Sequence, residues 1–273
     1  MTAAVPLLSV VWACYAPAAI ETIIIIKNHA MKILLFLCTI SSLCAQFRVH
    51  ANNAHGWWNY FGDHLIGNTK WGLHLEGQWR RHEVATQWQQ LLIRPAVNYS
   101  IHPNITLTAG YGFIATSRYG EFPVGVPFPE HRVFQQAQVV QRLGKINTSH
   151  RYRLEQRELG ELSVAPNGDR RVTRWRHENR FRYMYRVMIP LKGKWSLALY
   201  DEIFVNFGKN VAANTFDQNR AYAAIAYALP KKSRLEIGFM EQSLLQRNGR
   251  IIENNHTLMV SIFSTMPFGQ RKD

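Results

Sequence analysis

The amino-acid sequence predicts an all-β fold, namely a transmembrane antiparallel up-and-down β-barrel of about ten to twelve strands. Three observations predict it. Apolar and polar residues alternate with a period of two over most of the chain. The alternating segments are about 10–15 residues long, whereas ordinary strands have about five or six. Short connections between the segments alternate with long ones, as they do in outer-membrane barrels.

The first part of the chain carries the pattern of an export signal. Met31 and Lys32 precede a short apolar run, residues 33–40, and small residues follow as far as Ala45. A basic start, a short apolar core and small residues at the end are typical of a secretory signal peptide. The run is also shorter than the roughly 18–20 residues that a membrane-spanning helix needs. We therefore expect residues 31–45 to be a cleaved signal.

Residues 1–30 stand upstream of this complete signal. We expect them to be a misassigned extension, with Met31 as the true start of the protein. An unusually long signal or a membrane anchor is the alternative. Residues 46–273 then form the predicted barrel domain.

Composition excludes several classes of protein for this domain. All three cysteines lie in the first 44 residues, so the domain holds neither a disulfide scaffold nor a cysteine zinc site. The formal charge of +14 is of the kind that nucleic-acid-binding proteins carry. However, a secretory signal takes the chain away from nucleic acid, and the basic residues follow one face of long strands. We expect no nucleic-acid partner.

Turn residues divide the domain into eleven alternating segments. A strand that crosses an outer membrane at a tilt needs about 9–11 residues, which these segments provide with short overhangs. The predicted strands are residues 55–65, 70–81, 86–100, 104–117, 131–143, 147–158, 172–188, 194–206, 218–229, 233–246 and 252–264.

The connections differ in length on the two sides of the predicted sheet. Five are short, whereas three of those that alternate with them are long and hold prolines, glycines or asparagines. Short turns at one rim and long loops at the other are typical of outer-membrane barrels. The short connections are 66–69, 101–103, 144–146, 189–193 and 230–232, and the long ones are 117–130, 159–171 and 207–217.

Alternation within single strands separates an apolar face from a polar one. In residues 70–81 the apolar face runs from Trp71 through Leu73 and Leu75 to Trp79, and the other face holds charged and amide side chains. Aromatic residues recur beside the short turns, where an interfacial girdle is expected. These are Trp71, Tyr99, Tyr185, Trp195 and Tyr227. A secreted soluble β-sandwich also has alternating strands and is the alternative fold.

Three features depart from a regular barrel of this kind. Asp201 and Glu202 are adjacent, so one carboxylate would face lipid unless a β-bulge intervenes or the pair lies above the bilayer. Residues 172–179 place polar side chains on the apolar phase, so we expect them to project beyond the membrane. Eleven segments also conflict with the even strand number usual in bacterial barrels. Either residues 46–53 supply a further strand or the bounds of one segment are wrong, and we expect twelve strands.

The polar phase of the strands is rich in arginine. If it faces inward, arginines outnumber carboxylates in the interior, with Arg132, Arg186, Glu76 and Glu202 among them. The other residues expected to line the interior are Arg80, Arg94, Arg142, Arg151, Arg153, Glu155, Arg157, Arg174, Arg176, Glu178, Arg180, Arg182, Arg220 and Glu236.

Two interpretations of this interior stay open. Arginine and glutamate side chains could close it as a ladder of ion pairs, because lipid cannot host them. Alternatively, the arginines could favour anionic solutes in a small channel, because cationic rings in a pore attract anions.

No catalytic pattern appears in the domain. The motifs G-x-S-x-G, H-E-x-x-H and the P-loop are absent from the sequence. Ser149 and His150 are adjacent, as are Asn255 and His256, so on a strand each pair points to opposite faces. We expect no catalytic residue, metal or cofactor. The alternative is an outer-membrane enzyme that acts on lipid or lipopolysaccharide through residues from distant strands.

The order of several motifs resembles a known family. They include a tryptophan-rich first hairpin, Gly110-Tyr111-Gly112, arginine–glutamate strands at 152–157 and 176–185, and residues 201–206. The most specific is Phe216-Asp217-Gln218-Asn219-Arg220. Over about residues 55–265 the chain resembles the uncharacterised bacterial outer-membrane proteins called domain of unknown function 2490, which is common in Bacteroidetes-type bacteria. The resemblance implies a barrel in the outer membrane of a Gram-negative bacterium and brings no activity or substrate.

These observations together predict a non-enzymatic barrel in the bacterial outer membrane. Its expected partners are outer-membrane lipid and lipopolysaccharide, the barrel-assembly machinery during biogenesis, and small anionic solutes.

Overall fold

The computed structural model describes residues 48–269. The predicted signal peptide and residues 1–30 lie outside the described residues. Within 48–269, no helix combines the length and the apolar character needed to cross a membrane.

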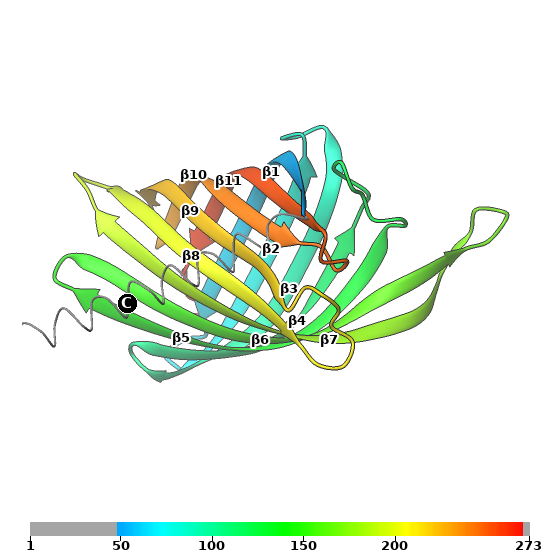
Figure 1. Cartoon of the computed structure of the whole chain (residues 1–273). Helices are drawn as coiled ribbons and strands as arrows, with labels where there is room; N and C mark the ends of the chain where they lie inside the picture. The colour runs from blue at the N-terminus through cyan, green and yellow to red at the C-terminus, as the bar shows by residue number, and fades with distance from the viewer. Residues whose placement is uncertain (1–47, 270–273) are drawn as a thin grey trace, which may run out of the picture. The chain divides into compact units, whose positions relative to one another are not determined.

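Eleven strands form one closed barrel within the described residues (Figure 1). Each predicted segment corresponds to one of them, because alternation with a period of two suits a sheet that buries one face. The strands are β1 (Val49–Leu65), β2 (Trp71–His82), β3 (Gln87–His102), β4 (Ile105–Thr116), β5 (Phe128–Leu143), β6 (Ile146–Val164), β7 (Arg170–Pro190), β8 (Trp195–Phe207), β9 (Phe216–Leu229), β10 (Ser233–Leu245) and β11 (Ile251–Ser264).

The first and last strands close the barrel by pairing in parallel. Every other neighbouring pair is antiparallel, but β1 and β11 run in the same direction, from Val49 opposite Ile251 to Gly62 opposite Ser264. An odd number of strands makes this necessary. Consecutive strands alternate in direction, so the first and the eleventh run the same way and can pair only in parallel. The expectation of twelve strands is therefore wrong. Val49 to Asn53 lengthen β1 instead of forming a strand of their own.

The buried face of the sheet is the polar one. In β2 the side chains of His74, Glu76, Gln78 and Arg80 are buried, whereas Trp79 on the other phase is exposed. The same inversion holds around the barrel, where valines, isoleucines, leucines and aromatic residues make up the outer face. A soluble sheet buries its apolar face, so this pattern indicates a barrel of the transmembrane type.

Aromatic side chains pair on the outer face beside the short turns. Trp71 and Tyr99 have ring centroids 4.6 Å apart, and Trp195 and Tyr227 have the same separation. These four residues come from the girdle that the sequence predicts.

Strands β6 and β7 extend beyond their neighbours as a free hairpin, which projects from the rim in Figure 1. β6 pairs with β5 only as far as Leu159, and β7 pairs with β8 only from Asn179. Both continue to pair with each other out to Val164 and Arg170. Residues 172–178 therefore extend past β8, whereas Asn179 still pairs with Phe207, and the predicted long loop over 159–171 is wrong. Only the turn at 165–169 separates the two strands, and Gly168 supplies its positive φ of 87°.

The adjacent acids of β8 are accommodated without a β-bulge at their own position. Glu202 is buried in the interior, and Asp201 lies on the outer face. There the Asn219 amide donates to both Asp201 carboxylate oxygens, at 3.0 and 3.1 Å. The irregularity of this strand pair lies instead between Phe204 and Val205. A side chain on the next strand therefore offsets the exposed carboxylate.

The parallel seam predicts which residues a disulfide can join. The Asn59 amide donates to the Ser261 hydroxyl at 3.0 Å across β1 and β11. We expect the Asn59→Cys, Ser261→Cys pair to form a disulfide on oxidation of the folded protein, detected by mass after thiol alkylation. The matched control is Asn59→Cys with Asn255→Cys, because Asn255 lies opposite Asn53 in the register. Cross-linking of the control pair alone would contradict the parallel register.

Candidate functional site

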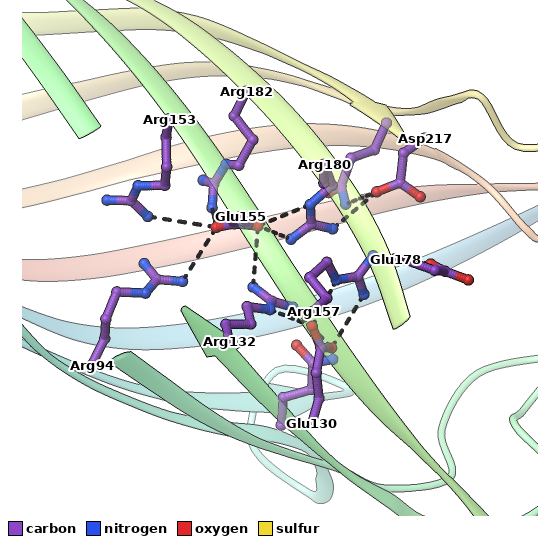
Figure 2. Close-up of polar contacts among 12 residues, drawn as sticks. Arg94, Glu130, Arg132, Arg153, Glu155, Arg157, Glu178, Arg180, Arg182 and Asp217 are labelled. Carbon is purple, nitrogen blue, oxygen red and sulfur yellow. Dashed lines mark hydrogen bonds and ion pairs between the residues drawn. The ribbon is translucent and has the colours of Figure 1, made fainter. Parts of the chain in front are cut away.

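The barrel interior holds a network of arginines and carboxylates, part of which Figure 2 shows. The inward phase of β3, β5, β6, β7 and β8 supplies most of these side chains, and on β6 and β7 arginine or glutamate occupies several successive inward positions. Glycine on the inward phase of β4 leaves room for them. A Cβ at Gly112 would lie 3.4 Å from the Arg94 Nε.

Glu155 of β6 is the centre of this network and is fully buried. Its carboxylate accepts from Arg180 Nη2 at 2.6 Å and from Arg182 Nη1 at 2.7 Å, both on β7 (Figure 2). Charge-assisted contacts of this kind are the strong hydrogen bonds of proteins. Three further guanidinium groups lie 3.8–3.9 Å from the same carboxylate, those of Arg94, Arg132 and Arg153.

A second group of ion pairs lies toward the long loops. Glu130 accepts from Arg132 and, at 2.6 Å, from Arg157 Nε. Glu178 accepts at 2.9 Å from Arg176 and at 2.7 Å from Arg247 of the β10–β11 loop. Asp217 at the start of β9 accepts from Arg180 at 3.0 Å. The network therefore links loop residues to the strands.

A third group lies toward the short turns. Glu202 accepts from Arg151 and from Arg182, both at 2.8 Å. Glu236 accepts from Arg186 and, at 2.7 Å, from Arg234. Glu76 accepts from Arg94 at 2.7 Å.

Aromatic rings on the inner face support several of these cations. The guanidinium carbon of Arg182 lies 4.3 Å from the centroid of Phe204, and that of Arg153 lies 4.8 Å from Phe134. Both rings are buried inside the barrel. A cation over an aromatic face is stabilised most where water is excluded, as it is here.

The structure brings twelve of the fourteen predicted site residues into this interior or its loop-side rim. Arg142 and Arg174 are not among them. Arg142 is exposed beside a short turn and donates to the Gly144 carbonyl at 3.1 Å. The Arg174 side chain is 66% exposed on the projecting hairpin. Both share the inward phase of their strands but lie past the end of the barrel, so their prediction as lining residues is wrong.

Four charged residues of the network are not predicted from the sequence. Glu130 and Asp217 lie one position before the predicted strands at 131 and 218, and Arg247 lies one position after the predicted strand 233–246, so the predicted bounds place all three in connections. Arg234 lies at the start of β10, two residues from Glu236 on the same phase, and that spacing could have identified it.

An internal cavity of about 480 Å³ runs beside the network. Near the short turns it is lined by Asp63, Ser264 and Thr265, and near the long loops by Gln89 and Tyr119. Its lining thus includes residues from both ends of the barrel.

The β4–β5 loop narrows the loop-side end of this cavity. The Tyr119 ring lies 5.6 Å from His55 and 6.0 Å from His82, ring centroid to ring centroid. The Phe122 carbonyl accepts from the Gln246 amide at 3.1 Å. Burial of Tyr119 raises the pKa of its hydroxyl, so this side chain is uncharged at neutral pH.

The described residues do not assemble a group of three His, Cys, Asp or Glu side chains suited to a metal. Ser149 lines the cavity, whereas His150 points outward and contacts the Tyr183 hydroxyl at 2.8 Å. The two residues of this adjacent pair therefore face opposite sides of the strand, as their spacing predicts.

The central carboxylate predicts a large stability effect. We expect Glu155→Gln to lower the free energy of unfolding by about 3–5 kcal/mol, because it leaves several buried arginines without their shared counter-charge. Urea unfolding of the refolded barrel in lipid vesicles measures this. The matched control is Glu158→Gln, whose side chain is 42% exposed on the outer face. The control should stay within about 0.5 kcal/mol of the parent. Equal effects of the two variants would contradict a central role for Glu155.

Comparison with solved structures returns other β-barrels at low similarity. The structure of the NanC porin matches with 13% identity and a TM-score of 0.44, covering 73% of this chain and 92% of the other. The β domain of the Bordetella autotransporter BrkA matches with 13% identity and a TM-score of 0.41, covering 66% and 80%. OmpT, an outer membrane protein of Vibrio cholerae, matches with 8% identity and a TM-score of 0.34, covering 67% and 59%.

A search of curated protein sequences finds no significant match. A family model does match, over residues 54–253, which is most of the barrel. Its description is that of a protein of unknown function, DUF2490. The match spans ten of the strands completely or in large part, together with the start of β11 and the interior network. The chain belongs to the DUF2490 family of proteins of unknown function.

Proposed function

We propose that this protein is a non-catalytic barrel of the bacterial outer membrane that admits small anions to its interior. The observation that carries the proposal is the cavity of about 480 Å³, whose lining reaches both rims and in which arginine is the most frequent residue. The proposal has two parts, the membrane location and the preference for anions.

The outer face supports the membrane location. Val133 and Ile237 are each 51% exposed, and apolar side chains surround the barrel at similar exposure. A belt of this size would be unfavourable in water and matches the lipid-facing band of outer-membrane barrels. Lipid and lipopolysaccharide are then the surrounding partners. The predicted signal peptide is consistent with export, after which the barrel-assembly machinery would insert the chain.

The charge balance supports the preference for anions. Eleven arginines but only six carboxylates line the cavity. Positive charge inside a narrow pore of low dielectric constant attracts anions and repels cations. An anion entering from water would therefore meet a favourable potential.

The ion-pair network limits the size of the solutes that could enter the interior. Side chains around Glu155 and Glu130 fill the part of the interior next to β3–β7, so the passage is confined to the remaining space. This combines the two interpretations that the sequence leaves open, since a ladder of ion pairs closes one side and leaves a cavity on the other. Small solutes and a low conductance follow.

Single-channel recording in a planar bilayer tests the proposal. We expect small, steady conductance steps from the refolded protein and a reversal potential that favours chloride over potassium. Arg151→Gln should lower this selectivity, because Arg151 lines the cavity and its partner Glu202 keeps a second arginine, Arg182.

The control is Arg171→Gln, which removes the same charge from the exposed tip of the projecting hairpin and should leave selectivity unchanged. A shift in gel mobility on heating shows in each case that the barrel is folded. Absence of conductance from folded protein, or selectivity for cations, would refute the proposed channel.

A further inference from the structure

Two arginines of the interior differ from the others in having no acidic partner. Arg80 and Arg220 line the cavity, yet within residues 48–269 no carboxylate oxygen lies within 4.0 Å of either guanidinium group. The remaining arginines of the cavity lining each have at least one such carboxylate. The excess positive charge of the interior is therefore concentrated at Arg80 and Arg220.

Neutral groups hold both side chains in place. Arg80 donates to the amide oxygens of Gln78, at 2.9 Å, and Gln90, at 2.6 Å. Arg220 Nε donates to the Gln218 amide oxygen at 3.1 Å. Amide oxygens accept hydrogen bonds from these cations but do not neutralise their charge. Burial of a charge without a counter-charge is costly.

Trp57 joins the two arginines into one site. Its ring centroid lies 3.9 Å from the guanidinium carbon of Arg80 and 5.2 Å from that of Arg220. The indole N–H donates to the buried Gln89 side chain at 2.8 Å, which fixes the ring. The arginines thus occupy defined positions on a rigid aromatic support, as the residues of a binding site do.

Part of the wall beside these arginines is apolar. Trp57 packs in a cluster with Tyr222, Met240 and Met259, from β9, β10 and β11. Tyr200 packs against this cluster, and its ring lies 4.6 Å from that of Tyr222. Tyr222 is two residues from Arg220 on the same inward phase. Unpaired cations and an apolar surface are therefore adjacent.

We propose that this part of the cavity, the Trp57 site, binds organic anions that combine one acidic group with a small apolar body. The acidic group lies between Arg80 and Arg220, and the apolar body lies on Tyr200, Tyr222 and Met259, which all line the cavity. The inference rests on the proposed function, because it names the class of anion that the interior accepts. The cavity volume of about 480 Å³ is within the range of small-molecule sites.

The chemistry of the site excludes other classes of anion as preferred ligands. A small inorganic anion or acetate would neutralise the arginines but leave the aromatic and methionine wall without a contact. A strongly polar polyanion would require more unpaired cations than these two. Only a ligand with both an acidic group and an apolar surface uses the whole site.

Isothermal titration calorimetry of the folded barrel in detergent tests the proposal directly. Benzoate is the probe, with titration into protein-free detergent as the blank. Acetate carries the same acidic group without the ring, and benzyl alcohol carries the ring without the charge. We expect benzoate to bind at least about tenfold more tightly than either, because each of them makes only one of the two contacts.

Variants assign the binding to the site. Arg80→Gln and Arg220→Gln should each weaken benzoate binding about tenfold or more. Met259→Gln should weaken benzoate binding while leaving acetate binding unchanged, because Met259 lines the cavity and carries no charge. The control is Arg142→Gln, which removes the same charge from an exposed position outside the cavity and should bind benzoate like the parent. Heat-modifiable gel mobility confirms that each variant is folded.

The outcomes separate this inference from the proposed function. Benzoate binding that depends on Arg80 and Arg220, in a barrel without conductance, would support the Trp57 site and refute the channel. Anion-selective conductance without tighter binding of benzoate than acetate would support the channel and overturn the inference. Benzoate binding that survives both arginine variants would also overturn it.

Discussion

Pairing of β1 with β11 is the constraint on which the rest of the structure depends. It removes both edges of the sheet, so every strand has a hydrogen-bonded neighbour on each side. Only a closed sheet can place its outer face in hydrocarbon, because unpaired backbone groups there would cost several kcal/mol each. Closure also creates the interior. Since the outer face takes the apolar side chains, the inward phase takes the polar ones, and their charges must be satisfied by one another. The position of Glu155 among five arginines follows from this requirement.

The interior is asymmetric, and the asymmetry gives it chemical character. The side formed by β3–β7 is filled with ion pairs, and the side formed by β9, β10, β11 and β1 carries aromatic and methionine side chains. Arg80 and Arg220 stand at the boundary, supported by Trp57. An interior in which every arginine had a carboxylate partner would serve only to fill and stabilise the barrel. An interior that leaves two cations with neutral partners beside an apolar wall has the features of a site that selects its ligand.

Much of the fold could be predicted from the sequence, because strand alternation is a local property. Each of the eleven segments was identifiable from its own residues, as was the face that each presents. The parallel closure could not be predicted in this way. Val49 and Ile251 pair although they lie at opposite ends of the barrel sequence, and no local pattern indicates that pairing. Asp201 shows the same limit, because the Asn219 side chain that accommodates it lies on the next strand. For the site, the position of a residue in the alternation predicted whether its side chain faces the interior, but not where along the barrel axis it lies. Arg142 and Arg174 have the inward phase yet lie past the barrel, and Glu130 and Asp217 lie within it although proline- and asparagine-rich segments precede them.

The odd strand number also separates the two ends of the barrel. β1 begins at the rim of the long loops, and β11 ends at the rim of the short turns, because the two strands are parallel. The 14 residues of β11 alone span a contour of about 46 Å. A circular permutant would therefore need a linker that passes from one rim to the other, and no short loop could join the ends. A reporter domain fused directly before β1 and another fused directly after β11 would stand at opposite rims, so this barrel could serve as a scaffold that holds two fused domains apart.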